Sequence, residues 1–165
     1  MSTPAVSPAS PSPVSTAPSA SSASTAPSNQ VSTTKFGDTF AYQDGLQVKV
    51  EGPAVFTPSD VDAGATPGDK TVKLAVTLTN GTSGVFDASG VTVRATAGDN
   101  GRQVGTIAGE GLGIDFAGTI VAGASQTVTF GFDIPKDTVG NKFDVEVDPD
   151  FIGKYVSEHW VGTLP

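Results

Sequence analysis

Alternation of apolar and polar residues with a period of two is the feature that most constrains the fold of this chain. It is clearest in five stretches, at 46–51, 71–79, 91–96, 127–134 and 142–147. Successive side chains of a β-strand point to opposite faces, so this period predicts strands with one buried and one exposed face. No stretch of ten residues combines a helical period with good helix formers. The chain is therefore predicted to be all-β.

Turn sequences separate these stretches. They are Asp44-Gly45, Asn80-Gly81, Asp99-Asn100-Gly101 and Gly140-Asn141. Gly and Asn accept positive φ at little cost, which suits tight hairpins. Many short strands with such turns predict two antiparallel sheets packed face to face. A small closed barrel is the alternative, and the sequence does not separate the two.

The inward side chains of the alternating stretches make up the predicted core. They are Leu46, Val48, Val50, Leu74, Val76, Leu78, Val91, Val93, Val128, Phe130, Phe132, Phe143, Val145 and Val147. Weaker strands are predicted near 36–42, 103–107, 115–120 and 155–161. A foldable part of roughly 130 residues is long enough to bury such a core without disulfides.

The first 34 residues have a different composition. Residues 2–28 are Ser, Thr, Ala or Pro at every position except Val6 and Val14, and every charged residue lies between Lys35 and Glu158. Such sequence cannot bury enough apolar surface to compensate for its ordering entropy, and it is typical of extracellular stalks. We therefore predict a disordered linker over residues 1–34 and one folded domain over residues 35–165. We also expect a signal or an anchor, either lipid or transmembrane, upstream of Met1.

Charge and composition argue against several functions. The net charge of −8 belongs to the folded part, and a chain this acidic repels nucleic acids and anionic membranes. The absence of cysteine removes thiolate nucleophiles, zinc–thiolate sites and iron–sulfur clusters. A single histidine, His159, and the lack of a Gly-x-Ser-x-Gly motif leave no evident hydrolase site. We predict no catalytic residue, cofactor or metal, and therefore no enzyme.

Two groups of residues are candidates for recognition. Tyr155, His159 and Trp160 form a candidate interaction patch, since aromatic residues often anchor interfaces. The alternative is that His159 is a half-buried residue of the last strand. The acidic residues favour a solvated acidic face, with calcium binding as the second interpretation. They are Asp144, Glu146 and Asp148 along one strand, and Asp60, Asp62 and Asp69 in a loop.

The order of the segments resembles a known family. The resemblance is carried by the opening segment Lys35–Val48, by Phe56-Thr57-Pro58-Ser59-Asp60, by the strand Val72–Asn80, by Val85-Phe86-Asp87 and by Asp144–Phe151. These pieces resemble the actinobacterial extracellular family of unknown function that includes many lipoproteins (the DUF4352 type), with an MPT63-like sandwich. The resemblance implies an immunoglobulin-like β-sandwich, export and often a lipid anchor. It supplies no catalytic residues, and the lipid-bearing cysteine of such lipoproteins is absent here.

The expected function is an extracellular binding module of the cell envelope, displayed on a stalk. Its partner would be an unidentified protein or glycan, and the domain itself would not contact a membrane. One alternative is a structural or antigen-like envelope protein without a specific ligand. Another is a calcium-stabilised sensing domain.

Overall fold

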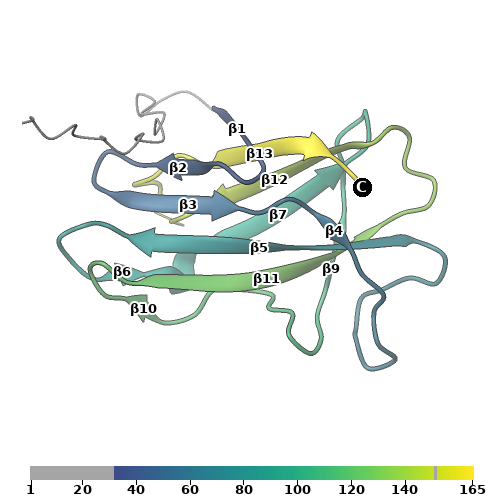
Figure 1. Ribbon diagram of the computed structural model, residues 1–165, viewed down its shortest axis with the longest axis horizontal. Helices are drawn as coiled ribbons and strands as arrows, with labels where there is room; N and C mark the ends of the chain where they lie inside the picture. The colour runs from purple at the N-terminus through teal and green to yellow at the C-terminus, as the bar shows by residue number, and fades with distance from the viewer. Residues whose placement is uncertain (1–31, 151) are drawn as a thin grey trace, which may run out of the picture.

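The chain folds into two facing β-sheets and a small third sheet at one end (Figure 1). The computed structural model describes residues 32–150 and 152–165. The first sheet has the strand order β1 (Thr33–Lys35), β13 (Glu158–Thr163), β12 (Lys142–Asp148), β7 (Thr92–Ala97) and β8 (Arg102–Gln103). The second has the order β2 (Thr39–Ala41), β3 (Leu46–Val50), β5 (Lys70–Asn80), β11 (Ser125–Ile134) and β9 (Gly105–Ile107), with β4 (Ala54–Val55) beside β5. The third consists of β6 (Phe86–Asp87) and β10 (Thr119–Ile120), and one turn of 3-10 helix, η1 (Ala88–Gly90), follows β6.

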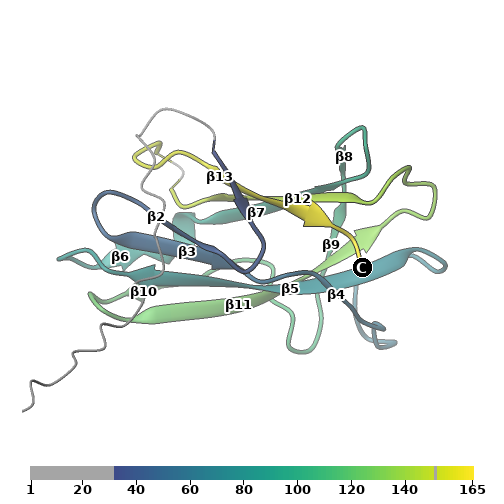
Figure 2. The same ribbon diagram turned by 45° about the horizontal axis from the view of Figure 1, so that its top comes forward.

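The two large sheets lie one above the other as a sandwich (Figure 2). All strand pairs are antiparallel except β1 with β13, which is parallel. The longest ladder joins β5 and β11, from Thr79 opposite Ser125 to Lys70 opposite Ile134. Within the described ranges no strand ladder joins the two large sheets, so the structure is a sandwich rather than a closed barrel. The all-β prediction is confirmed.

The core lies between the sheets and follows the alternation. All of the predicted core residues are buried except Val93 and Val128, which are partly exposed and pack against the buried cluster. Trp160 is fully buried and joins this cluster. Gly45, Gly101 and Gly140 have positive φ, as their turn sequences predict, whereas Gly81 does not. Gly45 lies in the β2–β3 turn with φ +101°, next to the backbone carbonyl of Gly81. A Cβ at Gly45 would clash with that backbone.

The first described residues are part of the sandwich. β1 begins at Thr33, so the first strand takes in Thr33 and Thr34, which the sequence places in the linker. The remainder of the predicted linker, residues 1–31, lies outside the described residues. The carboxylate of Glu158 is almost fully buried and accepts hydrogen bonds from Ser32 Oγ and, at 2.7 Å, from Thr34 Oγ1. These bonds tie β1 to the start of β13.

After β1 the chain crosses to the other sheet, where β2 pairs with β3. The crossing is held by the buried indole, because Trp160 Nε1 donates to the Asp38 carbonyl at 3.1 Å. The Phe36 ring packs next to Gly162 and stacks on Phe143 at 6.0 Å between ring centroids. The N-terminal segment thus fastens both sheets together.

Asn80 organises the loop that follows β5. Its side chain is fully buried, and Nδ2 donates to the carbonyls of Gly84 and Ile120 at 2.8 and 2.7 Å. Its Oδ1 accepts from the amide and the hydroxyl of Thr82. The sequence predicts only a turn here. The amide side chain also fixes the position of the segment that enters β6.

Loss of the Thr34 hydroxyl should weaken the attachment of β1. In Thr34→Val the buried carboxylate of Glu158 loses one of its two hydroxyl donors, so we expect the free energy of unfolding to fall by about 1.5–3 kcal/mol. The exposed neighbour gives the control: Thr33→Val should change it by less than about 0.5 kcal/mol. Urea unfolding followed by the fluorescence of the single tryptophan measures both. Equal stabilities for the two variants would contradict this role of Glu158.

Candidate functional site

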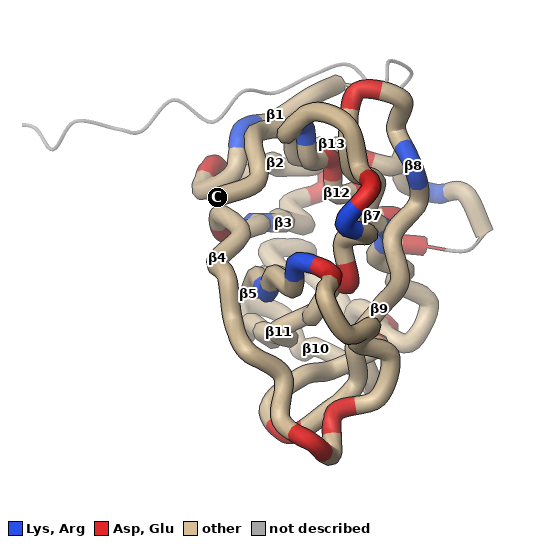
Figure 3. Tube along the Cα trace, turned by 90° about the vertical axis from the view of Figure 1, so that its right-hand side faces the viewer, with Lys and Arg blue, Asp and Glu red and all other residues tan. Residues whose placement is uncertain are grey.

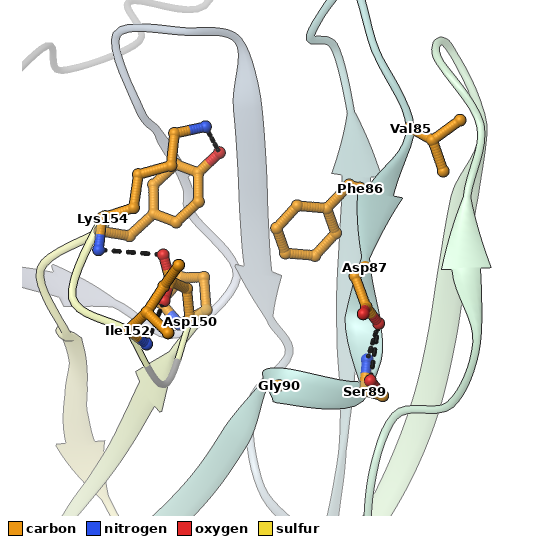
Figure 4. Close-up of a pocket in the computed structure, with 10 residues that line it drawn as sticks. Val85, Phe86, Asp87, Ser89, Gly90, Asp150, Ile152 and Lys154 are labelled. Atoms are coloured by element: carbon orange, nitrogen blue, oxygen red, sulfur yellow. Dashed lines mark hydrogen bonds between the residues drawn. The ribbon is translucent and has the colours of Figure 1, made fainter.

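A cleft of about 530 Å³ lies at the end of the sandwich where the β2–β3 hairpin, the β5–β6 loop and the β12–β13 loop meet. One wall is the segment through β6 and η1, with Phe86, Asp87 and Ser89. The other wall is the β12–β13 loop, from Pro149 to Tyr155. Figure 4 shows the Phe86 ring projecting from β6 into the space between these walls. The cleft is within the size range of ligand sites, about 300–1,000 Å³.

Aromatic rings form the base of this cleft. Tyr155 packs edge to face on Tyr42 at 4.9 Å between ring centroids, and Phe86 lies 6.1 Å from Tyr155. Tyr42 in turn contacts Phe40, and its hydroxyl donates to the Val156 carbonyl at 2.8 Å. The β12–β13 loop is therefore packed against the β2–β3 hairpin, which makes this wall of the cleft rigid.

Both walls are shaped by aspartates that accept backbone hydrogen bonds. Asp87 Oδ1 accepts from the amide and the hydroxyl of Ser89, and so caps η1. Asp150 accepts from the amides of Ile152, Gly153 and Lys154. Short polar side chains that bond to nearby amides favour such turns. Ile152, at the top of the Asp150 turn, is 86% exposed.

A charged network lies behind the loop wall. Asp44 Oδ2 accepts from the hydroxyl of Tyr155 at 2.6 Å and from Lys154 Nζ at 2.9 Å. Partial burial alone would raise the pKa of Asp44, but the hydrogen bonds from Tyr155 and Lys154 outweigh it, so the pKa lies below its usual value. Burial, and then the bond to Asp44, raise the pKa of the Tyr155 phenol. The network keeps Asp44 ionised and Lys154 protonated, and so fixes Tyr155.

The structure does not bring the three residues of the predicted interaction patch onto one surface. Trp160 is buried between the sheets, with its Nε1 bonded to the Asp38 carbonyl. His159, which precedes Trp160 in β13, is half-buried on the outer face, as the alternative interpretation predicts. Tyr155 lies in the preceding loop and lines the cleft. Only Tyr155 belongs to the candidate site.

His159 has an acidic partner. Its Nδ1 lies 2.9 Å from Asp144 Oδ1 on the neighbouring strand β12. A hydrolytic triad would also need a serine hydroxyl bonded to the ring, and within the described ranges His159 has no such bond. Inside the cleft, the Ser89 hydroxyl donates to Asp87.

The other acidic residues stabilise loops. Asp62 accepts from the amides of Ser59 and Glu110, and Asp69 accepts from the amide of Lys136. A Cβ at Gly109 would overlap the Asp62 carboxylate, which explains one glycine of the Gly109–Gly113 run. Across residues 32–150 and 152–165, no group of three or more candidate ligands is placed to hold a metal ion. The same ranges contain no helix that is long and apolar enough to cross a membrane.

Comparison with solved structures finds bacterial proteins of similar fold. No family model matches the chain, and no curated protein matches its sequence significantly. The solved structures that match include Bacillus subtilis ycdA, described as a candidate lipoprotein (TM-score 0.59, 16% identity, 79% of this chain and 39% of that chain). They also include the secreted protein MPT63 of Mycobacterium tuberculosis (TM-score 0.55, 18% identity, 82% of this chain and 100% of that chain). A third is Bacillus subtilis yjhA (TM-score 0.57, 16% identity, 79% of this chain and 99% of that chain).

These likenesses show the fold alone, because the identities are so low. The chain spans about two fifths of the length of ycdA, 39%. None of the three descriptions names an enzymatic activity. The MPT63-like sandwich expected from the sequence is confirmed at the level of architecture.

Removal of the Tyr155 hydroxyl should produce a pH-dependent loss of stability. The pKa of Asp44 is lowered in the folded state, so its contribution is present above the unfolded value of about 3.9 and is lost as the pH falls through the folded value. We expect Tyr155→Phe to cost less than about 1 kcal/mol at pH 7, because Asp44 is partly solvated. The difference from the natural chain should vanish near pH 2.5.

Urea unfolding between pH 2.5 and 7 measures this difference, and a carboxyl NMR titration should show a higher pKa for Asp44 in the variant. Tyr42→Phe is the matched control, because its hydroxyl donates to a carbonyl that does not titrate. Its effect should be constant over this range. A Tyr155→Phe effect that persists unchanged at pH 2.5 would show that the bond to Asp44 is unimportant.

Proposed function

We propose that this protein is an exported, non-enzymatic binding module of the cell envelope that holds its partner in the cleft between β6 and the β12–β13 loop. The observation that carries the proposal is the cleft itself. It combines two aromatic residues, Phe86 and Tyr155, with an isoleucine, Ile152, that is 86% exposed at its edge. Single exposed apolar residues are ordinary on a protein surface, but a cleft lined by several apolar side chains is typical of a contact surface.

Export and anchoring belong to this proposal. The matches to a candidate lipoprotein and to a secreted protein support export, although they share only the fold. The predicted linker over residues 1–34 supports a stalk. Membership of the actinobacterial DUF4352-type family is likewise proposed, on the segments that resemble it.

The place where the chain enters the sandwich bears on where the partner lies. Ser32 contacts Glu158, the first residue of β13, directly after the loop that forms a wall of the cleft. A stalk joined to Ser32 would therefore enter the domain beside this loop and keep the cleft within reach of the envelope. We infer that the partner is a component of the envelope.

Loss of the apolar side chain at the edge of the cleft should weaken partner binding without unfolding the domain. The change is Ile152→Ser, which adds no charge, since Ile152 is exposed and makes no core contact. The matched control is Val139→Ser, because Val139 is also an exposed branched residue, 71% accessible, in the β11–β12 loop at the opposite end. Both variants should unfold at the urea concentration of the natural chain.

The measurement is capture from envelope and culture-fluid fractions of the source organism on immobilised protein. We expect one envelope component to be retained by the natural chain and by Val139→Ser, and reduced at least about tenfold by Ile152→Ser, a loss of about 1.4 kcal/mol. Equal retention by all three proteins would place the contact elsewhere. No retention by any of them would favour a structural envelope protein without a specific ligand.

A further inference from the structure

The charges around the cleft are unequal, and their geometry suggests the chemistry of its occupant. Asp87 and Asp150 stand on opposite walls, as Figure 4 shows. Lys154 is the only cation among the described residues that line the cleft. The net charge that a ligand meets in the cleft therefore depends on where the Lys154 ammonium points and on whether the carboxylates remain accessible.

The Lys154 ammonium is already paired. It bonds to Asp44 Oδ2 at 2.9 Å and to the Tyr155 hydroxyl at 2.8 Å, and it lies 4.6 Å from the centroid of the Tyr155 ring. These contacts, the bond to Tyr155 first, raise the pKa of Lys154. Its charge is compensated within the loop wall, which leaves the two aspartates of the cleft without a cationic partner.

Asp87 is available to a ligand. Ser89 bonds to Oδ1 only, and within residues 32–150 and 152–165 Oδ2 has no hydrogen-bond partner. The bonds from Ser89 hold the pKa of Asp87 below its usual value, so the carboxylate is charged at neutral pH. A carboxylate can accept up to about four hydrogen bonds. The free oxygen can therefore receive an ammonium or guanidinium group.

Negative charge extends behind the cleft. The pKa of the Tyr42 phenol is raised by burial, and further by the negative charges of Glu158 and Asp148. The opposite end of the sandwich differs, because lysine and arginine positions lie there among the acidic ones (Figure 3). Ion pairs at that end include Arg102 with Asp137 and Lys142 with Asp99. Within the described residues that line the cleft, by contrast, the one cation is already paired.

The apolar part of the cleft lies between these charges. The Phe86 ring, 7% exposed, lies at the inner side of the cleft, and the exposed Ile152 side chain comes from the opposite wall, so one apolar side chain of a ligand can lie between Ile152 and the exposed edge of Phe86. Aromatic and aliphatic anchors of this kind supply most of the binding energy in small interfaces, while flanking charges supply specificity and speed of association.

We propose that the occupant of the cleft is a basic peptide segment of a partner protein, with an apolar side chain seated between Phe86 and Ile152 and with a flanking lysine or arginine facing Asp87. This inference rests on the proposed function and narrows it from an envelope component to a protein. Anionic glycans and phosphorylated ligands are disfavoured by the same charges.

Amide NMR titrations of the full chain with short capped probes test this inference. The probes are the pentapeptides KKFKK, SSFSS and EEFEE, together with a soluble tetramer of N-acetylglucosamine. We expect KKFKK to shift the amides of residues 85–90 and 152–155 and to bind about fivefold more tightly than SSFSS, since exposed ion pairs are weak individually. EEFEE and the sugar should produce no saturable shifts. Raising the salt concentration should weaken the binding of KKFKK towards that of SSFSS.

Asp87→Asn tests the charge without changing the shape of the cap. It should weaken KKFKK about threefold and leave SSFSS unchanged. Asp60→Asn is the matched control, because Asp60 is an exposed aspartate in the 56–64 loop, outside the cleft, and its loss should affect neither peptide. If the two variants had equal effects, the preference for KKFKK over SSFSS would come from the net charge of the protein and not from the cleft. That result would overturn the inference.

Three further outcomes would overturn it: equal affinity for the three peptides, binding of the sugar alone, or no binding of any probe in the cleft. The last result is separable from a failure of the proposed function. If envelope capture still depends on Ile152 while KKFKK does not bind, the cleft remains a binding site and only its preference for basic peptides is wrong.

Discussion

Burial of two inner sheet faces against each other is the constraint on which the rest of this structure depends. Val48, Val76 and Val145 are fully buried between the layers, and the buried Trp160 lies in the same cluster. With no cysteine in the chain, this apolar contact and the bond from Trp160 to the Asp38 carbonyl in the crossing segment hold the sheets together. The loops at the strand ends are thereby free of core packing and available to form a cleft.

Much of the fold follows from the sequence because the side-chain period of a strand is local. The residues from Val72 to Leu78 alternate, and the structure buries the apolar ones. Neighbouring residues of a strand cannot share a face, and this explains why His159 and Trp160 do not form one patch. The same rule applied to β13 separates them without a structure. The burial of Asn80 could not be foreseen, because its partners Gly84 and Ile120 meet only through long-range packing.

The cleft was less accessible to prediction than the fold. Phe86 and Asp150 are far apart in the sequence, and neither has a motif that links it to the other. Their encounter depends on the order of strands in two sheets and on the packing of Tyr155 against Tyr42. One local signal for the cleft did exist in the sequence. Ile152 lies between Asp150 and Gly153, outside the alternating stretches, and an apolar residue at such a position is not expected in the core. The hydrogen bonds among Asp44, Tyr155 and Lys154 hold the end of the β12–β13 loop against the β2–β3 hairpin, where it forms one wall of the cleft.

The most direct test of the central claim, that the cleft is the binding site, is site-specific photo-crosslinking in the source organism. A photoreactive amino acid is placed at position 152 or, for comparison, at position 139 at the other end of the sandwich. The account predicts a discrete crosslinked species at position 152 and none at position 139. The same species at both positions, or at position 139 alone, would contradict it.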